Sequence, residues 1–140
     1  MSFKLSVTSQ TRLLGVNPDL LAVTNLAIKI TVIDFGIPPD GGIRTAERQK
    51  ELYDKKVSKA DGYNNLSNHQ SGDALDFYAY VDGKASWESH HLAMVACAHL
   101  QAASMMGVKI NWGGFWQRKT PKYKNGIPYG WDMAHIERSD

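Results

Sequence analysis

The sequence is poor in cysteine, in long apolar runs and in excess charge of either sign. Its 140 residues contain one cysteine, Cys97, which lies within an apolar helical pattern and has no second cysteine to pair with. The fold therefore needs neither a disulfide nor an oxidising compartment. We interpret Cys97 as a small buried hydrophobic residue rather than as a nucleophile.

Other absences exclude further classes of protein. No apolar run approaches the roughly 18 residues of a membrane-spanning helix, and the first residues lack a secretory signal pattern, so we expect cytoplasmic synthesis and no membrane insertion. A net charge of +2, from 16 basic and 14 acidic residues, is too small to predict a nucleic-acid partner. Because no repeat or linker is visible, we expect one domain over residues 1–140. We also expect a monomer.

Helix and strand patterns alternate along the chain. Caps indicate the helix ends: Asn17 before Pro18, Thr45, Ser86 and the terminating Gly107. Helices are predicted over residues 18–30, 46–56 and 87–106, strands over 31–35, 72–80, 108–112 and 133–137, and a long surface loop over 117–130. These elements predict a small α+β domain with an antiparallel sheet flanked by helices.

The five histidines fall into three sets. His90 and His91 are consecutive in a helix, so their side chains should diverge by roughly 100° and face solvent or neighbouring helices. His99 lies on the apolar face of the same helix and is expected in the core. His69 and His135 remain, each beside carboxylates in segments with glycine or strand character.

The segment 67–76 reads Ser-Asn-His-Gln-Ser-Gly-Asp-Ala-Leu-Asp and places His69 seven residues before Asp76. Imidazole and carboxylate are ligand types of catalytic zinc, which usually takes three protein ligands, so a third must come from elsewhere. A strand at the C-terminus would point His135 and Glu137 to one side, with Asp132 at its entrance. Hydrolysis also needs a carboxylate to move a proton, and Asp132 is the candidate.

These residues carry a resemblance to a known family. Residues 67–76 match the Ser-x-His-x-x-Gly-x-Ala-x-Asp motif of VanY-type zinc D-alanyl-D-alanine carboxypeptidases, and Asp132-x-x-His135 resembles their second motif. A nearer resemblance is to the small bacteriophage L-alanyl-D-glutamate endopeptidases. It rests on the start Met-Ser-Phe-Lys, the segments 42–45 and 72–77, and the terminal Asp-x-x-His-x-Glu.

The resemblance implies a zinc site with His69, Asp76 and His135 as ligands and Asp132 as general base. Arg44 would steady the substrate oxyanion, although a surface salt bridge is the alternative. The fold would be like that of the hedgehog domain and the D,D-peptidases. The protein would be a phage endolysin that cleaves the stem peptide of peptidoglycan, after a holin releases it from the host cytoplasm to the periplasmic wall.

Other expectations stay open at this point. Ser67 could bind a substrate carboxylate or only cap a turn, while Trp131, like Tyr78 and Trp116, could line the substrate groove or pack in the core. Asp73 and Glu137 are candidate acceptors for the second N–H of the ligand histidines.

Two alternative functions also remain. One is a D-alanyl-D-alanine carboxypeptidase or dipeptidase, and the other is a non-catalytic metal-binding module of the same fold. The presence of both Asp132 and Arg44 favours an enzyme over the module.

Overall fold

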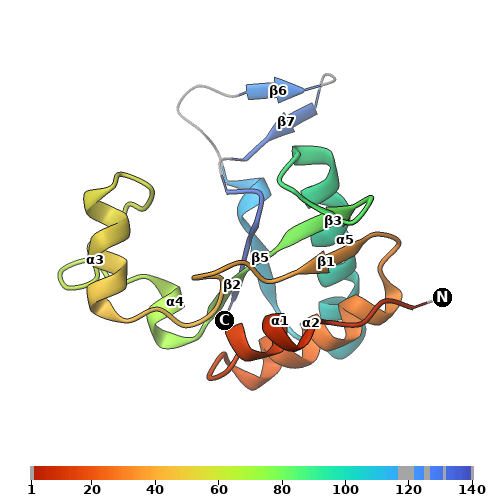
Figure 1. Cartoon of the computed structure of the whole chain (residues 1–140), viewed down its shortest axis with the longest axis horizontal. Helices are drawn as coiled ribbons and strands as arrows, with labels where there is room; N and C mark the ends of the chain where they lie inside the picture. The colour runs from red at the N-terminus through yellow and green to blue at the C-terminus, as the bar shows by residue number, and fades with distance from the viewer. Residues whose placement is uncertain (1, 117–121, 125–126, 131, 140) are drawn as a thin grey trace.

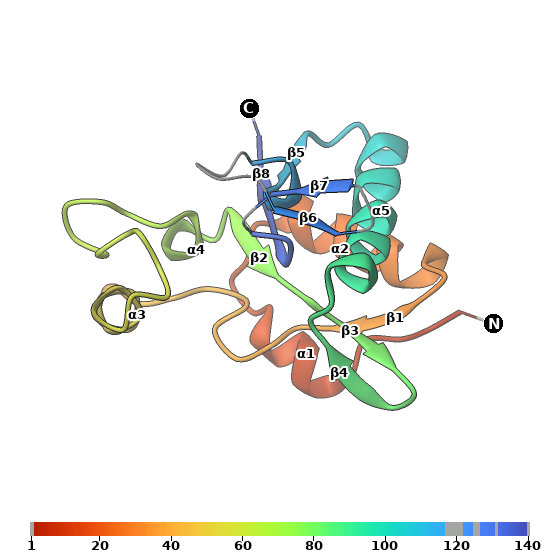
Figure 2. The ribbon, with the colours of Figure 1, turned by 90° about the horizontal axis from the view of Figure 1, so that it is seen from above.

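Helices and short strands alternate along the chain in the computed structural model, which describes residues 2–116, 122–124, 127–130 and 132–139. The helices are α1 (Val7–Arg12), α2 (Pro18–Ile30), α3 (Ala46–Asp54), α4 (Asn68–Ser71) and α5 (Ser89–Met106), with a 3-10 turn, η1 (Gly113–Phe115). The strands are β1 (Asp34–Gly36), β2 (Ala74–Asp76), β3 (Tyr78–Val81), β4 (Lys84–Ser86), β5 (Ile110–Trp112), β6 (Lys122–Lys124), β7 (Ile127–Tyr129) and β8 (His135–Arg138). The predicted α+β class is confirmed, and Figures 1 and 2 show helices around small sheets.

Two three-stranded antiparallel sheets meet where β2 runs into β3. One sheet has the order β1-β3-β4 and the other β2-β8-β5. The prediction of a single strand over 72–80 is therefore wrong. The N–H of Asp76 donates to the carbonyl of Gly41 (2.8 Å) and that of Phe77 to the carbonyl of Ala134 (2.9 Å), so the chain changes partners at this point. The alternation of buried and half-buried side chains continues through the change, which is why the sequence pattern did not reveal it.

The core lies between the long helices and the two sheets. Helix α2 packs along α5, and α5 also contacts β3 and β5, one strand from each sheet. The contact is apolar because α2 presents a stripe at helical spacing and β2–β3 presents alternate residues. Fully buried members of this core include Leu20, Val23, Ala27, Leu75, Phe77, Val95 and Ile136.

Capping explains most helix boundaries. Asn17 accepts a hydrogen bond from the N–H of Asp19 ahead of α2, and Thr45 accepts one from that of Arg48 ahead of α3, as predicted. Gly107 ends α5 in the left-handed region at φ 70°. Helix α5 begins two residues later than predicted, since Ser86 belongs to β4 and Glu88 is the N-cap.

Three smaller expectations are wrong. Strand β1 starts three residues later than predicted because Thr31 still caps α2. The predicted loop over 117–130 contains the antiparallel pair β6 and β7. Cys97 is exposed rather than buried.

None of the helices in the described residues has the length and apolar character needed for a membrane span.

His99 is a core residue, as predicted. Its ring lies 4.9 Å from that of Phe35 and 5.1 Å from that of Phe77, between centroids. Nδ1 donates to the carbonyl of Val95 (3.0 Å), so Nε2 accepts from the hydroxyl of Thr24 (3.2 Å). Burial disfavours the charged ring and lowers the pKa of His99 to about 4.

We therefore expect stability to fall as the pH drops from about 6.5 towards 4. An unfolded histidine takes up a proton near pH 6.5, whereas the buried one resists it until about pH 4, so the unfolded state gains protons first. The free energy of unfolding should lose about 2 kcal/mol from this residue by pH 5. Urea titrations of the wild type and of His99→Gln between pH 5 and 7 would check this. An equal pH dependence in both proteins would contradict it.

Candidate metal and catalytic site

His69 lies on a single helical turn that is closed at both ends. Ser67 forms a capping box: its hydroxyl accepts from the N–H of His69 (3.1 Å), while Gln70 accepts from the N–H of Ser67 (2.8 Å). Gly72 ends α4 in the left-handed region at φ 79°, which favours glycine. The Ser-x-His-x-x-Gly part of the motif thus fixes the backbone around His69 through local hydrogen bonds. Ser67 caps this turn, which was one of its two expected roles.

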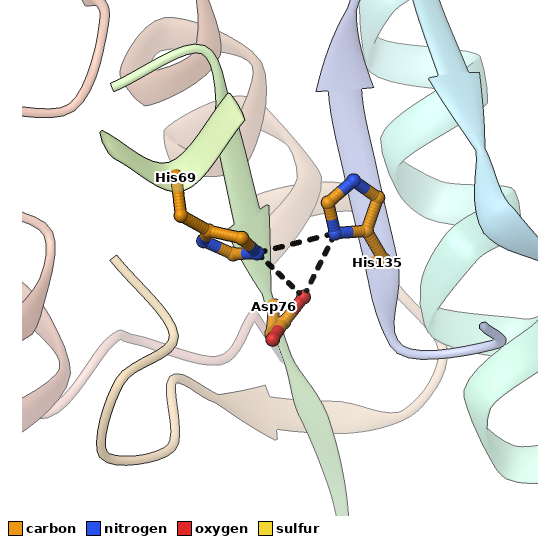
Figure 3. A group of neighbouring side chains, drawn as sticks. All are labelled: His69, Asp76 and His135. Atoms are coloured by element: carbon orange, nitrogen blue, oxygen red, sulfur yellow. Dashed lines mark hydrogen bonds and ion pairs between the residues drawn. The ribbon is translucent and has the colours of Figure 1, made fainter. Parts of the chain in front are cut away.

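Asp76 and His135 are cross-strand partners in β2 and β8, and His69 leans over them from α4 (Figure 3). The Nε2 atom of His69 is 3.3 Å from Oδ1 of Asp76 and 3.2 Å from Nδ1 of His135. Nδ1 of His135 is 3.1 Å from the same Oδ1. Two segments nearly 60 residues apart in sequence therefore present three ligand-type atoms as one compact triangle.

The size of this triangle matches a tetrahedral metal ion. Ligand bonds of about 2.0–2.1 Å in tetrahedral geometry put neighbouring ligand atoms about 3.3 Å apart. The three side chains are a group that could hold a metal ion, and both imidazoles are buried. The chemistry of the donors, two neutral nitrogens and a carboxylate oxygen, suits zinc and leaves a fourth position open.

The far nitrogens of both imidazoles are also held. His69 donates through Nδ1 to the carbonyl of Gly42 (3.0 Å), and His135 donates through Nε2 to Glu137 (2.9 Å). These bonds fix the ring orientation and leave the other nitrogen facing Asp76. Glu137 thus makes the contact expected of it. The expectation for Asp73 is wrong, because its carboxylate accepts from Asn17 and Ser71 instead.

The charges of these groups are strongly coupled. Burial alone would raise the pKa of Asp76, but hydrogen bonds from His135 and His69 hold that pKa far below its usual range. Burial likewise disfavours charge on His135, yet hydrogen bonds to Asp76 and Glu137 raise the pKa of its imidazole to about 9. A metal ion must therefore displace a proton from His135 as it binds.

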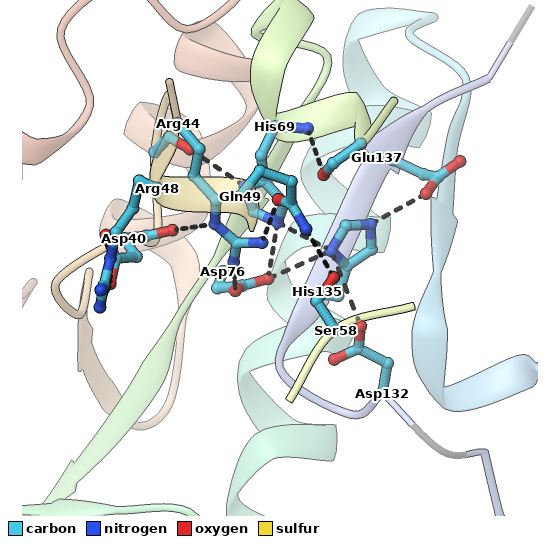
Figure 4. Close-up of polar contacts among 12 residues, drawn as sticks. Asp40, Arg44, Arg48, Gln49, Ser58, His69, Asp76, Asp132, His135 and Glu137 are labelled. Carbon is cyan, nitrogen blue, oxygen red and sulfur yellow. Dashed lines mark hydrogen bonds and ion pairs between the residues drawn. The ribbon is translucent and has the colours of Figure 1, made fainter. Parts of the chain in front are cut away.

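Asp132 stands beside the triangle (Figure 4), with Oδ2 at 3.9 Å from Nδ1 of His135. Burial, followed by the negative charge of Asp76, raises the pKa of Asp132, which brings this carboxylate closer to the range in which it can accept and release a proton. Its backbone is held against η1, where a Cβ at Gly113 would overlap the Asp132 carbonyl oxygen. Glycine is required there for this close approach.

Arg44 approaches the other oxygen of Asp76, as Figure 4 shows. One terminal nitrogen donates to Oδ2 of Asp76 (3.0 Å), the second donates to Gln49 (3.2 Å), and Nε donates to the carbonyl of Asp40 (2.9 Å). Only 12% of the side chain is exposed, so its ion pair is part of the site and not a surface salt bridge.

Gln49 is the functional candidate that the sequence did not reveal. It is fully buried in α3, and its amide nitrogen donates to the hydroxyl of Ser58 (2.6 Å) and the carbonyl of Ala60 (2.8 Å). One amide therefore connects Arg44 to the segment 58–60. In a helix otherwise rich in charge, Gln49 carried no signal that separates it from solvated neighbours.

The triangle, Arg44 and Asp132 line a cleft of about 280 Å³. Segment 57–60 and Trp116 also line the cleft, and the ring centroid of Trp116 is 5.1 Å from that of His135. Ser67 also lines the cleft. Tyr78 is placed elsewhere, against Tyr80 and Trp87, and Trp131 lies outside the described residues.

Comparisons with known proteins agree with this geometry. A family model described as phage L-alanyl-D-glutamate peptidase matches residues 1–138. The L-alanyl-D-glutamate peptidase of Escherichia phage T5 is 32% identical over 139 residues, 98% of each chain. The crystal structure of the L-Ala D-Glu endopeptidase ChiX of Serratia marcescens matches with a TM-score of 0.78 and 28% identity, over 97% of this chain and 90% of that one. The chain is therefore a peptidase that belongs to the phage L-alanyl-D-glutamate peptidase family.

Proposed function

We propose that this protein is a zinc-dependent endolysin that cleaves the bond between L-alanine and D-glutamate in the peptidoglycan stem peptide. The observation that carries the proposal is the buried triangle of His69, Asp76 and His135 with the carboxylate of Asp132 beside it. The names of the relatives specify the bond. The proposed zinc ligands are the three residues of the triangle.

Asp132 is the proposed general base. Zinc, when bound, would polarise the scissile carbonyl and make water more acidic. Asp132 would take the proton from the attacking water and pass it to the nitrogen of the leaving D-glutamate as the peptide C–N bond breaks. Its raised pKa supports both halves of this transfer.

Arg44 is proposed to stabilise the negative charge that develops on the substrate carbonyl oxygen. A guanidinium has five N–H donors, so the bonds to Asp76, Gln49 and Asp40 orient it and leave capacity for a substrate oxygen. A donor that is already oriented costs no reorganisation during the reaction. Gln49 would therefore act as a positioning residue.

Ser67 and Trp131 are the proposed substrate contacts. The Ser67 hydroxyl lines the cleft and already accepts a hydrogen bond from His69, but it can still donate its own proton to a substrate carboxylate. Trp131 precedes the proposed base directly in sequence, which supports a place beside the cleaved bond.

The proposed setting is host-cell lysis. The protein would act as a monomer, wait in the host cytoplasm, and reach peptidoglycan in the periplasm once a holin opens the inner membrane. Digestion of purified peptidoglycan followed by mass spectrometry tests the cleaved bond. Fragments with a new N-terminal D-glutamate support the proposal, whereas release of free D-alanine would support a carboxypeptidase.

Asp132→Asn should lose at least about 100-fold in kcat while it retains the metal, because the amide cannot accept a proton. His69→Ala should instead lose the bound zinc. Zinc content and lysis of outer-membrane-permeabilised cells measure the two effects separately. Wild-type activity in purified Asp132→Asn would exclude this residue as the base.

Zinc uptake at pH 7 should release close to one proton from His135, because the pKa of this imidazole is about 9 and a ligand nitrogen must be unprotonated. The apparent affinity should accordingly weaken as the pH falls. Calorimetric titration with zinc in two buffers of different ionisation enthalpy gives the proton count. Glu137→Gln removes a partner that raises this pKa, so in this variant the proton release should begin to decline at a lower pH than in the wild type. The same pH dependence of proton release in both proteins would contradict the assignment.

Gln49→Leu should lower kcat by about 10-fold or more and leave the zinc content unchanged, because it removes the acceptor that orients Arg44. Gln49→Glu retains an acceptor and should recover part of the activity. Thermal unfolding of both variants controls for general destabilisation. A loss confined to stability, with normal kcat in the folded fraction, would assign Gln49 a structural role only.

A further inference from the structure

A second group of metal-ligand side chains lies at the start of α5. Oε2 of Glu88 is 3.4 Å from Nε2 of His90 and 3.6 Å from Nδ1 of His91. The two imidazole rings are 4.1 Å apart, so the expectation that they diverge is wrong. In both views α4 and α5 lie on opposite sides of β2 (Figures 1 and 2), and this group shares no residue with the proposed catalytic site.

The position of this group is not explained by helix capping. Glu88 is the N-cap residue of α5, yet its side chain makes no capping hydrogen bond. The carboxylate faces the two imidazoles instead.

The spacing of the three side chains suits a metal ion. Their ligand atoms all lie within 4.8 Å of one another, and the two distances from Glu88 are near the about 3.3 Å expected between neighbouring ligands of tetrahedral zinc. The hydroxyl of Ser86 lies 2.7 Å from Nδ1 of His91. A metal ion bound at Nδ1 would replace this hydrogen bond, because the nitrogen has a single lone pair.

We propose that Glu88, His90 and His91 form a second, exposed binding site for a divalent transition-metal ion such as zinc. Two imidazoles and one carboxylate favour zinc, copper or nickel over calcium or magnesium, which prefer oxygen ligands. The exposed fractions are 58% for the Glu88 side chain, 46% for His90 and 20% for His91, so the ion reaches the site directly and water completes its coordination. The bound ion would connect the N-cap of α5 to the first turn of the helix.

Equilibrium dialysis of the full chain against excess zinc, followed by elemental analysis, tests the proposal. The wild type should bind two zinc ions per chain and the double variant His90→Ala/His91→Ala one. Gln101→Ala, an exposed change on the same helix, is the matched control and should bind two. One ion in the wild type, or two in the double variant, would overturn the second site.

A thermal readout separates this site from the catalytic one. His69→Ala lacks a proposed catalytic ligand, so zinc should still raise its Tm through the second site alone. Adding His90→Ala should remove that increase, and the single change at an exposed side chain preserves the fold. An equal Tm increase with and without His90 would contradict the proposal. Two zinc ions bound to His69→Ala would contradict the catalytic ligand set instead.

Discussion

The site depends on one carboxylate that serves two sets of contacts. Oδ1 of Asp76 faces both imidazoles of the triangle, Oδ2 accepts from Arg44, and the backbone N–H of the same residue bonds to Gly41. Asp76 is also the last residue of β2, just before the chain passes into the other sheet. Strand β8, the α4 turn and the loop before α3 therefore converge on the charged side chain of Asp76.

A charged carboxylate in this position requires partners because its removal from water is costly. The first partner is His135. The pairing of β2 with β8 places it directly opposite Asp76, so no further ordering of the chain is needed. The second partner is His69, which the capping box of α4 holds in place. The third is Arg44, which the buried amide of Gln49 orients. The three triangle residues thus lie on regular elements, whereas Arg44 and Asp132 lie in loops next to α3 and β8.

Local signals made much of this predictable from the sequence. The caps at Asn17, Thr45 and Gly107 mark where helices begin or end, and the motif spacing singled out His69 and Asp76. Contacts between segments that are distant in the sequence leave no such local signal. The carbonyl of Gly42 as partner of His69, and the role of Gln49, depend on chain segments that meet only in the folded protein. The passage of 74–81 between two sheets was missed because side-chain alternation is the same in one ladder or two.

The charge balance of the site is a further argument for a divalent cation. Asp76, Asp132 and Glu137 contribute three negative charges close to the triangle, and Arg44 contributes one positive charge, which leaves an excess of two negative charges with both imidazoles neutral. Without a metal ion, bound protons neutralise part of this negative charge. Against the effect of burial, Asp76 and Glu137 raise the pKa of His135 to about 9, while burial and then Asp76 raise that of Asp132. A dication would neutralise the same excess, displace the proton from His135 and leave Asp132 as the group free to exchange a proton, which is the division of roles that peptide hydrolysis requires.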